Sequence, residues 1–392
     1  MRMQIPFHRP YITKSEIDAV KDTLKSGWLT MGPKTIEFEE EFRKYIGCKN
    51  TVALNSCTAA LHLALEAIGL RQGDEVITSP FTFAATGEAI CYFKARPVFV
   101  DIERDTCNIN VNKIEEKITQ KTRAIIPVHY GGQPCNMDEI REIARRYNLF
   151  VIEDAAHALP SFYKGKKIGT IGDITCFSFY ATKPLATGEG GMLCTDNEEW
   201  AERMRCMRLH GIGKDAWRRY SKEGSWYYEV SMLGYKYNMT DIQAALGIEQ
   251  LKKLDFMYKK RKRIAKRYTE AFKDIEEIIT PSIKGNGDTS WHLYSIKLRT
   301  KGIRNSFIEG LKEKGIGTSV HFIPLYRFPF YKESFHYDPS DFPDCEWVYE
   351  RTVSLPIYPG MTDKEVEYVI ENIMDVVKGK IEKYHSWLDF IT

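Results

Sequence analysis

The chain has 392 residues, of which 43% are hydrophobic and 28% are charged, with a formal net charge of +3. This length favours two domains, each able to bury its own core. A nearly neutral charge argues against an extended nucleic-acid surface, and the longest apolar runs are too short to span a membrane. The first ten residues lack the apolar core of a signal peptide.

Nine cysteines are scattered along the chain without any C-x-x-C pair. This pattern argues against both a disulfide framework and a zinc site. We therefore expect a cytoplasmic protein with reduced thiols that binds no metal, no nucleic acid and no membrane.

The N-terminal segment predicts a helix over residues 17–27, with Thr13 and Glu16 as a capping box. Short runs rich in Val and Ile then alternate with helical patterns such as 57–70 and 136–148. The strand-sized runs are residues 51–56, 75–79, 97–102, 123–130, 149–156 and 174–180. Apolar strands joined by helices predict an α/β fold whose mostly parallel sheet is covered on both faces. Such sheets bind ligands at the carboxyl ends of their strands.

A long polar helix over 248–273 is expected to lead out of the first domain, and its basic run is interpreted as a solvated face. Residues 275–392 mix short strands with helices, as in a smaller α+β domain. The strands are expected at 291–298 and 317–322, and the helices at 304–315 and 363–379. We expect a large domain over 1–255, whose N-terminal segment packs on the small domain, and a connector helix with a small domain over 256–392. The amphipathic tail 380–392 has no assigned role.

One lysine and one carboxylate are predicted to end neighbouring strands. The run 149–156 ends with Glu153 and Asp154, and the run 174–180 leads directly to Lys183. A surface lysine and a helix-capping acid are the alternative interpretations. A buried amine beside a buried carboxylate suits pyridoxal phosphate, whose aldehyde forms an imine with an amine and whose ring nitrogen needs an anion.

The junction between the strand at 51–56 and the following helix is a candidate phosphate-binding site, called the phosphate seat below. Ser56 and Thr58 stand there, where free backbone N–H groups attract anions, although both could be ordinary caps. Ser178, five residues before Lys183, could reach the same phosphate. Phe83 could cover a flat ring, unless it belongs to the core.

Several motifs together resemble a known family. They are "SFYATKPLATGEGG", "VIEDAAHA", "LNSCTAALHLAL", "GDEVITSPFTFAAT" and "GYKYNMTDIQAALGIEQL". With the segments from 26–42 to 354–370, they resemble the DegT/DnrJ/EryC1/StrS sugar aminotransferases, which are fold type I pyridoxal-phosphate enzymes. Within this group the chain is most similar to enzymes that aminate C4 of UDP-linked 4-keto sugars, of the UDP-4-amino-4-deoxy-L-arabinose type.

The resemblance implies a role for each matching position. Lys183 would hold the cofactor and shuttle a proton, Asp154 would pair with the pyridine nitrogen, and His157 would lie near the phenolic oxygen. The remaining cofactor contacts implied are Thr58, the backbone of Ala59, Ser178, Phe83 and Asn238, the last across a dimer interface. The implied sugar contacts are Trp28, Thr30, His321, Phe322 and Tyr326.

The chain departs from the family pattern at two places. Cys57 stands where many relatives have Gly, and it would crowd the phosphate unless its side chain points away. Many relatives also read Y-N-Y-R where this chain reads "YKYN", which leaves open whether Asn238 or Lys236 reaches a phosphate.

The resemblance implies a homodimer with shared sites that transfers the amino group of L-glutamate to a nucleotide-linked keto-sugar at C4. A 3-keto-sugar aminotransferase is one alternative. A sugar dehydratase of the same fold is another, but relatives of that kind replace the lysine by His. A dinucleotide-binding dehydrogenase is disfavoured because "TGEGG" is no G-x-G-x-x-G fingerprint. A non-catalytic binding protein would need no combination of Lys183, Asp154 and a phosphate seat.

Overall fold

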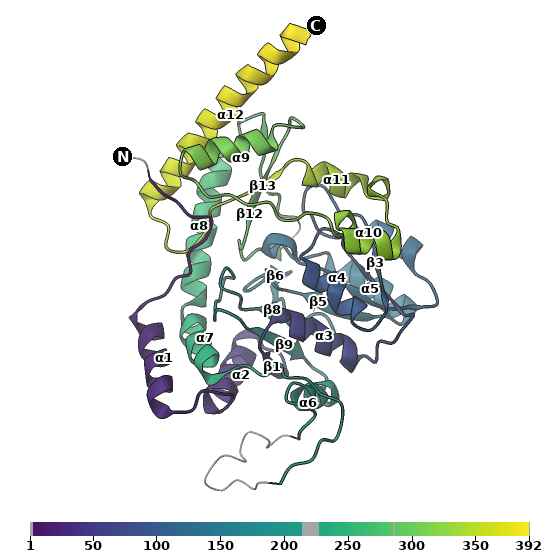
Figure 1. Ribbon diagram of the computed structural model, residues 1–392. Helices are drawn as coiled ribbons and strands as arrows, with labels where there is room; N and C mark the ends of the chain where they lie inside the picture. Colours follow the sequence, from purple (N-terminus) through teal and green to yellow (C-terminus); the bar gives the residue numbers. More distant parts are fainter. Residues whose placement is uncertain (1–2, 214–226, 285–286, 392) are drawn as a thin grey trace.

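The computed structural model describes residues 3–213, 227–284 and 287–391, with side chains up to residue 379. A seven-stranded sheet lies at its centre, in the order β1-β9-β8-β5-β4-β2-β3 (Figure 1). Its strands are β1 (Asn50–Leu54), β2 (Glu75–Thr78), β3 (Arg96–Phe99), β4 (Thr122–Ile126), β5 (Phe150–Asp154), β8 (Ile174–Ser178) and β9 (Gly191–Thr195). Only β9 runs against its neighbours in this sheet. The expected fold type I α/β architecture is confirmed.

Successive residues of the central strands enter two different hydrophobic clusters. In β5, Val151 packs into one cluster and Ile152 into the other, and in β4 Ile125 and Ile126 divide in the same way. Helices cover both faces because neither row of apolar side chains faces water. These helices are α2 (Pro33–Ile46), α3 (Cys57–Ala67), α4 (Ala84–Cys91), α5 (Met137–Tyr147), α6 (Glu198–Met207) and α7 (Asp241–Lys252).

A third cluster joins Ile5 to residues between 264 and 377. It contains the sheet β10-β12-β13 and the helices around it, α8, α9 and α12 (Figure 1). The elements are β10 (Ile278–Ile279), β12 (Tyr294–Leu298), β13 (Thr352–Leu355), α8 (Leu254–Phe272), α9 (Arg304–Glu313) and α12 (Asp363–Ile391). Ile5 forms a parallel bridge with Ile316, so the N-terminal segment reaches this part of the molecule. This separation of clusters supports our proposal of a domain boundary near residue 255.

Two expected elements are wrong. The helix over 248–273 is two helices, because Lys253 leaves helical geometry (φ −105°, ψ 1°) between α7 and α8. The break lets α7 pack on α1 (Lys14–Ser26) and α2 while α8 enters the third cluster. Residues 317–322 form no strand beyond a single bridge between Ser319 and Ser354.

Five smaller elements were not anticipated. The two-residue strands β11 (Gly287–Asp288), β6 (Phe162–Tyr163) and β7 (Lys166–Lys167) form a separate sheet. Two short helices, α10 (Pro329–Phe335) and α11 (Pro343–Tyr349), follow residues 317–322. The expected amphipathic character of 380–392 lies outside the described side chains.

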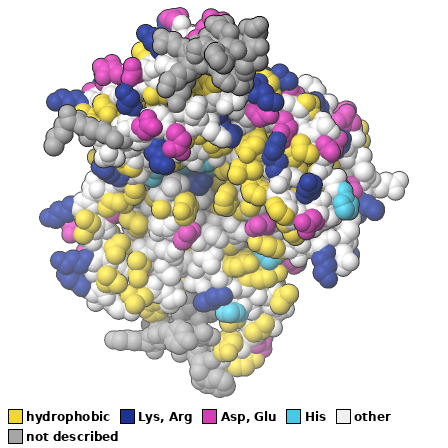
Figure 2. All heavy atoms as spheres, turned by 45° about the horizontal axis from the view of Figure 1, so that its top comes forward, with side chains coloured by type: hydrophobic (Ala, Val, Ile, Leu, Met, Phe, Trp, Pro, Cys, Tyr) yellow, Lys and Arg dark blue, Asp and Glu magenta, His cyan; other side chains and the backbone are white. Residues whose placement is uncertain are grey.

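The nine cysteines, all within the described residues, form no disulfide with one another. Within the described ranges, no helix is long and apolar enough to cross a membrane, and no cluster of acidic, His and Cys side chains could hold a metal ion. On the face drawn in Figure 2, basic and acidic side chains are intermixed.

Candidate active site

A cavity of about 430 Å³ lies where β5 and β8 end. This size is ordinary for a site that binds a small molecule. Eight residues selected from the sequence line it: Thr58, Phe83, Asp154, His157, Ser178, Lys183, His321 and Phe322. The structure therefore brings the proposed amine, carboxylate and phosphate seat together in one place.

The loop after β8 positions Lys183. Its backbone N–H donates to Tyr180 O (2.8 Å), while Phe179 N–H donates to Gly190 O (2.8 Å), which closes the loop on itself. Burial lowers the pKa of the Lys183 amine to about 8, although Cys57 and Asp154 act in the opposite direction. A sizeable neutral fraction near neutral pH makes this amine a nucleophile.

Asp154 is held at the end of β5 by hydroxyl and backbone donors. Thr86 Oγ1 donates to Asp154 Oδ2 (2.7 Å), and Ala156 N–H donates to Oδ1 (3.1 Å). Thr86 is itself bonded to Thr82 (2.8 Å), one turn earlier at the start of α4. The carboxylate is buried and lines the cavity, so it suits a cationic ring nitrogen.

The N-terminus of α3 forms the phosphate seat. Ser56 caps the helix, since its Oγ accepts from Ala59 N–H (3.1 Å), and Thr58 follows in the first turn. Gly191 of β9 lets this turn approach closely, because a Cβ there would lie 2.4 Å from Ser56 O. The free N–H groups of an eleven-residue helix, with Ser178 nearby, can hold a phosphate. The amide of Ala59 is occupied by Ser56.

The Cys57 thiol makes one close polar contact. Cys57 Sγ lies 3.7 Å from Cys176 O, and burial raises the pKa of this thiol well above its usual value. The sulfur is thus neutral and directed at the sheet, although the residue also borders the cavity.

His157 presents a fixed donor to the cavity. Its Nδ1 accepts a hydrogen bond from Gly131 N–H (3.2 Å), so the single proton of the neutral ring is on Nε2. Burial, followed by Lys183 and His321, holds the pKa of His157 well below 6.5. Nε2–H can therefore donate to a phenolic oxygen. Phe83 stands at the rim with 64% of its surface exposed, where it could cover a ring.

Three of the five expected sugar contacts do not line this cavity within one chain. Tyr326 lies outside this cavity, because its ring is buried against Phe342 (4.6 Å) and its hydroxyl donates to Glu346 (2.8 Å). Trp28 borders a different cavity beside α1 and α7, and Thr30 O accepts from the Asp241 N–H (3.1 Å).

The "YKYN" stretch runs beside the phosphate seat without lining the cavity. Asn55 N–H donates to Tyr237 O (2.7 Å), Asn55 Nδ2 donates to Lys236 O (3.3 Å), and Asn238 bridges Leu54. Asn238 Nδ2 lies 3.4 Å from Met239 O.

Sequence reasoning missed two polar groups of the site. Thr86 orients Asp154. The only sequence feature that could have indicated this role is that Thr82 and Thr86 are four residues apart at the start of a helix. His292 lines the cavity with its ring centre 4.4 Å from that of His157, and no local pattern marks it.

The profile of the "DegT/DnrJ/EryC1/StrS aminotransferase family" matches residues 10–374. The chain belongs to this family. It is 53% identical over 379 residues to the spore coat polysaccharide biosynthesis protein SpsC of Bacillus subtilis, covering 96% of this chain and 97% of SpsC. It is 60% identical over 376 residues to MJ1066 of Methanocaldococcus jannaschii, an uncharacterized protein, and the match covers 95% of this chain and 97% of MJ1066.

Solved structures of similar chains agree with the fold. The putative sugar aminotransferase Spr1654 from Streptococcus pneumoniae, in its PMP form, matches with a TM-score of 0.91 and 35% identity, covering 98% of this chain and all of that one. PseC from Helicobacter pylori, an aminotransferase involved in the biosynthesis of pseudoaminic acid, matches with a TM-score of 0.91 and 30% identity, covering 96% and 100%.

The protein is thus an aminotransferase of the DegT family, and its cofactor is pyridoxal phosphate. The donor set fits this group: an amine of lowered pKa, a buried carboxylate, a helix N-terminus and a fixed N–H donor around one cavity. When bound, the cofactor supplies an aldehyde for the amine and a ring that withdraws electrons.

Proposed function

We propose that the protein transfers the amino group of L-glutamate to a nucleotide-linked keto-sugar, at C4 of a UDP-4-keto sugar. The amino-transfer part of this proposal rests on one observation, that Lys183 and Asp154 line the same cavity. The similarity to SpsC, Spr1654 and PseC, which are described as polysaccharide-biosynthesis and sugar-aminotransferase proteins or as an aminotransferase of pseudoaminic acid biosynthesis, supports a sugar acceptor.

Each residue then has a task at a stated atom. Lys183 Nζ would bind the cofactor through its aldehyde, and as a free amine it would accept and return the proton that moves during amino transfer. Asp154 keeps a proton on the ring nitrogen, and His157 Nε2–H orients the phenolic oxygen. Thr58, Ser178 and the first turn of α3 hold the phosphate.

The charges of the cavity support a homodimer with shared sites. Lys183 is the only Lys or Arg among the described residues that line it. The cofactor phosphate, the glutamate carboxylates and a sugar diphosphate are all anionic, so a second copy of the chain would supply further cations. Val230 and Leu233, exposed at 62% and 79%, offer apolar surface for that copy.

The alternative amination at C3 would use the same cofactor residues. A sugar dehydratase is disfavoured because Lys183 is present. A cytoplasmic location suits cysteines that form no disulfide with one another.

The test uses purified protein loaded with cofactor. Glutamate should bleach the visible absorbance of the lysine-bound cofactor, and one member of a panel of UDP-, dTDP- and GDP-linked 3-keto and 4-keto sugars should restore it. Lys183→Ala should lack the lysine-bound absorbance and lose at least ~10²–10⁴-fold in turnover. Absorbance that persists in Lys183→Ala, or a wild type that glutamate does not bleach, would rule the proposal out.

A further inference from the structure

His321 is attached by one ring nitrogen to a row of buried hydroxyl groups. Its Nδ1 lies 3.0 Å from Ser354 Oγ, which lies 2.8 Å from Ser295 Oγ. Ser295 Oγ lies 3.1 Å from the Tyr130 hydroxyl, which donates to the backbone oxygen of His321 (2.6 Å). The row therefore begins and ends at the same residue.

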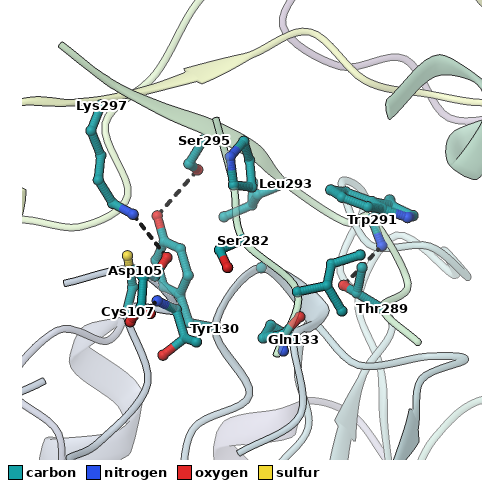
Figure 3. Close-up of a pocket in the computed structure, with 14 residues that line it drawn as sticks. Asp105, Cys107, Tyr130, Gln133, Ser282, Thr289, Trp291, Leu293, Ser295 and Lys297 are labelled. Carbon is teal, nitrogen blue, oxygen red and sulfur yellow. Dashed lines mark hydrogen bonds between the residues drawn. The ribbon is translucent and has the colours of Figure 1, made fainter. Parts of the chain in front are cut away.

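The Thr352 side chain also interacts with the Tyr130 hydroxyl, at the far end of the row from the His321 ring. Tyr130 and Ser295 border a small cavity of about 40 Å³, where their bond is drawn in Figure 3. Lys297, the cation at this cavity, donates instead to Asp105 O (2.9 Å). Ser354 lies in β13 and is fully buried.

The His321 ring is fixed in place and neutral. It stacks on Phe7 with ring centres 5.5 Å apart and meets Phe322 edge-on at 5.1 Å. Burial, with a smaller contribution from Lys183, lowers the pKa of His321 to about 4. Since Nδ1 is engaged by Ser354, Nε2 is the ring nitrogen left for a ligand in the large cavity.

The serine hydroxyl groups can form a hydrogen bond with either neutral tautomer of the His321 imidazole. The Tyr130 hydroxyl is placed to donate to His321 O (2.6 Å) and to Ser295 Oγ (3.1 Å), and its one proton favours the shorter contact to the carbonyl oxygen. The two serine hydroxyls can rotate together, so Ser354 either donates to Nδ1 or accepts from it. In the first arrangement Nε2 carries a proton and donates. In the second, Nε2 accepts.

We propose that His321 Nε2 contacts the polar group on the sugar carbon that is aminated, and that Ser354 and Ser295 are positioning residues that let it change from donor to acceptor. The inference rests on the proposed function. A ketone oxygen only accepts hydrogen bonds, whereas the amino group that replaces it donates. One neutral imidazole with a reversible hydroxyl row can bind both the substrate and the product.

The experiment measures the two half-reactions of the cofactor-loaded enzyme separately, by absorbance, with glutamate and with the keto-sugar that wild type accepts. Ser354→Ala should lower kcat/KM of the sugar half-reaction by ~10-fold or more, because Nδ1 loses its partner and the row is broken. The glutamate half-reaction should stay within about 2-fold. Ser319→Ala, on the residue that bridges Ser354 through backbone atoms alone, is the matched control and should change neither.

His321→Phe provides a second variant that keeps the stacking on Phe7 but removes both nitrogens. It should show the same selective loss in the sugar half-reaction. An equal loss in both half-reactions, or none in either variant, would overturn the inference. A wild type that does not react with glutamate at all would instead overturn the proposed function, so the two failures are distinguishable.

Discussion

Asp154 and Lys183 reach one cavity from neighbouring parallel strands, because β5 and β8 pair with Asp154 opposite Cys176. The carboxylate is fixed at the strand end, and the amine follows five residues after the end of the next strand. A cofactor between them would meet a nucleophile on one side and an anion on the other. The chemistry thus follows from the register of two strands.

Asp154→Asn tests the role of the negative charge. The amide keeps the shape and can still accept from Thr86, but it no longer favours a proton on the ring nitrogen. Turnover should fall ~100-fold or more, while the cofactor still binds. Steady-state kinetics and cofactor absorbance measure the two effects, and turnover near the wild-type rate would contradict the assigned role.

Glu153→Gln is the matched control for that substitution. The Glu153 carboxylate faces away from the cavity, where it accepts from Gly172 N–H (2.7 Å) and Thr175 Oγ1 (2.8 Å) and contacts His129 Nε2 (2.9 Å). Loss of this buried charge should lower stability by about 1–3 kcal/mol and leave the cofactor absorbance unchanged.

The pH dependence of cofactor uptake tests the environment of Lys183. Its amine is protonated below its pKa of about 8 and neutral above it, and only the neutral form attacks the aldehyde. Uptake by cofactor-free protein should therefore speed up as pH rises to about 8 and then level off. Rapid-mixing absorbance gives this profile. A rate that keeps rising toward pH 10.5 would show an unperturbed lysine.

Tyr326→Phe separates packing from substrate contact. The hydroxyl donates to Glu346 outside the cavity, so its removal should lower stability by about 1 kcal/mol and leave KM for the sugar unchanged. Thermal unfolding and steady-state kinetics report these values. An increase in KM with unchanged stability would return Tyr326 to the sugar pocket.

Leu233→Glu tests the proposed homodimer. A charge at this highly exposed apolar position should shift the protein toward monomer and reduce turnover at low protein concentration. Ile283→Glu, at a position exposed by 42% near the smaller cavity, should leave the assembly intact. Analytical sedimentation of both variants measures their oligomeric state. A dimer that persists in Leu233→Glu would show that this surface is not the dimer interface.

Six of the seven strands of the main sheet could be predicted from the sequence because they are continuous apolar runs, whereas β9 was missed. Asp154, Ser178 and Lys183 follow directly from where two of those runs end. The phosphate seat at α3 was equally visible as small hydroxyl residues between a strand and a helix. These features are local, so one stretch of sequence contains each of them.

Features that depend on distant contacts could not be predicted. Tyr326 enters the core because Phe342 and Glu346 meet it there, and the segment "VHFIPLY" does not reveal which way its rings point. The row from Tyr130 to Ser354 joins residues more than 200 positions apart in the sequence. Similarly, the break at Lys253 follows from two helices packing on different clusters.

Identification of the residue that holds the cofactor tests the central claim most directly. Borohydride reduction of the cofactor-loaded protein makes the linkage permanent, and peptide mass spectrometry then locates it. We expect the added mass on Lys183 alone. Attachment to another lysine, or no attachment at all, would contradict this expectation.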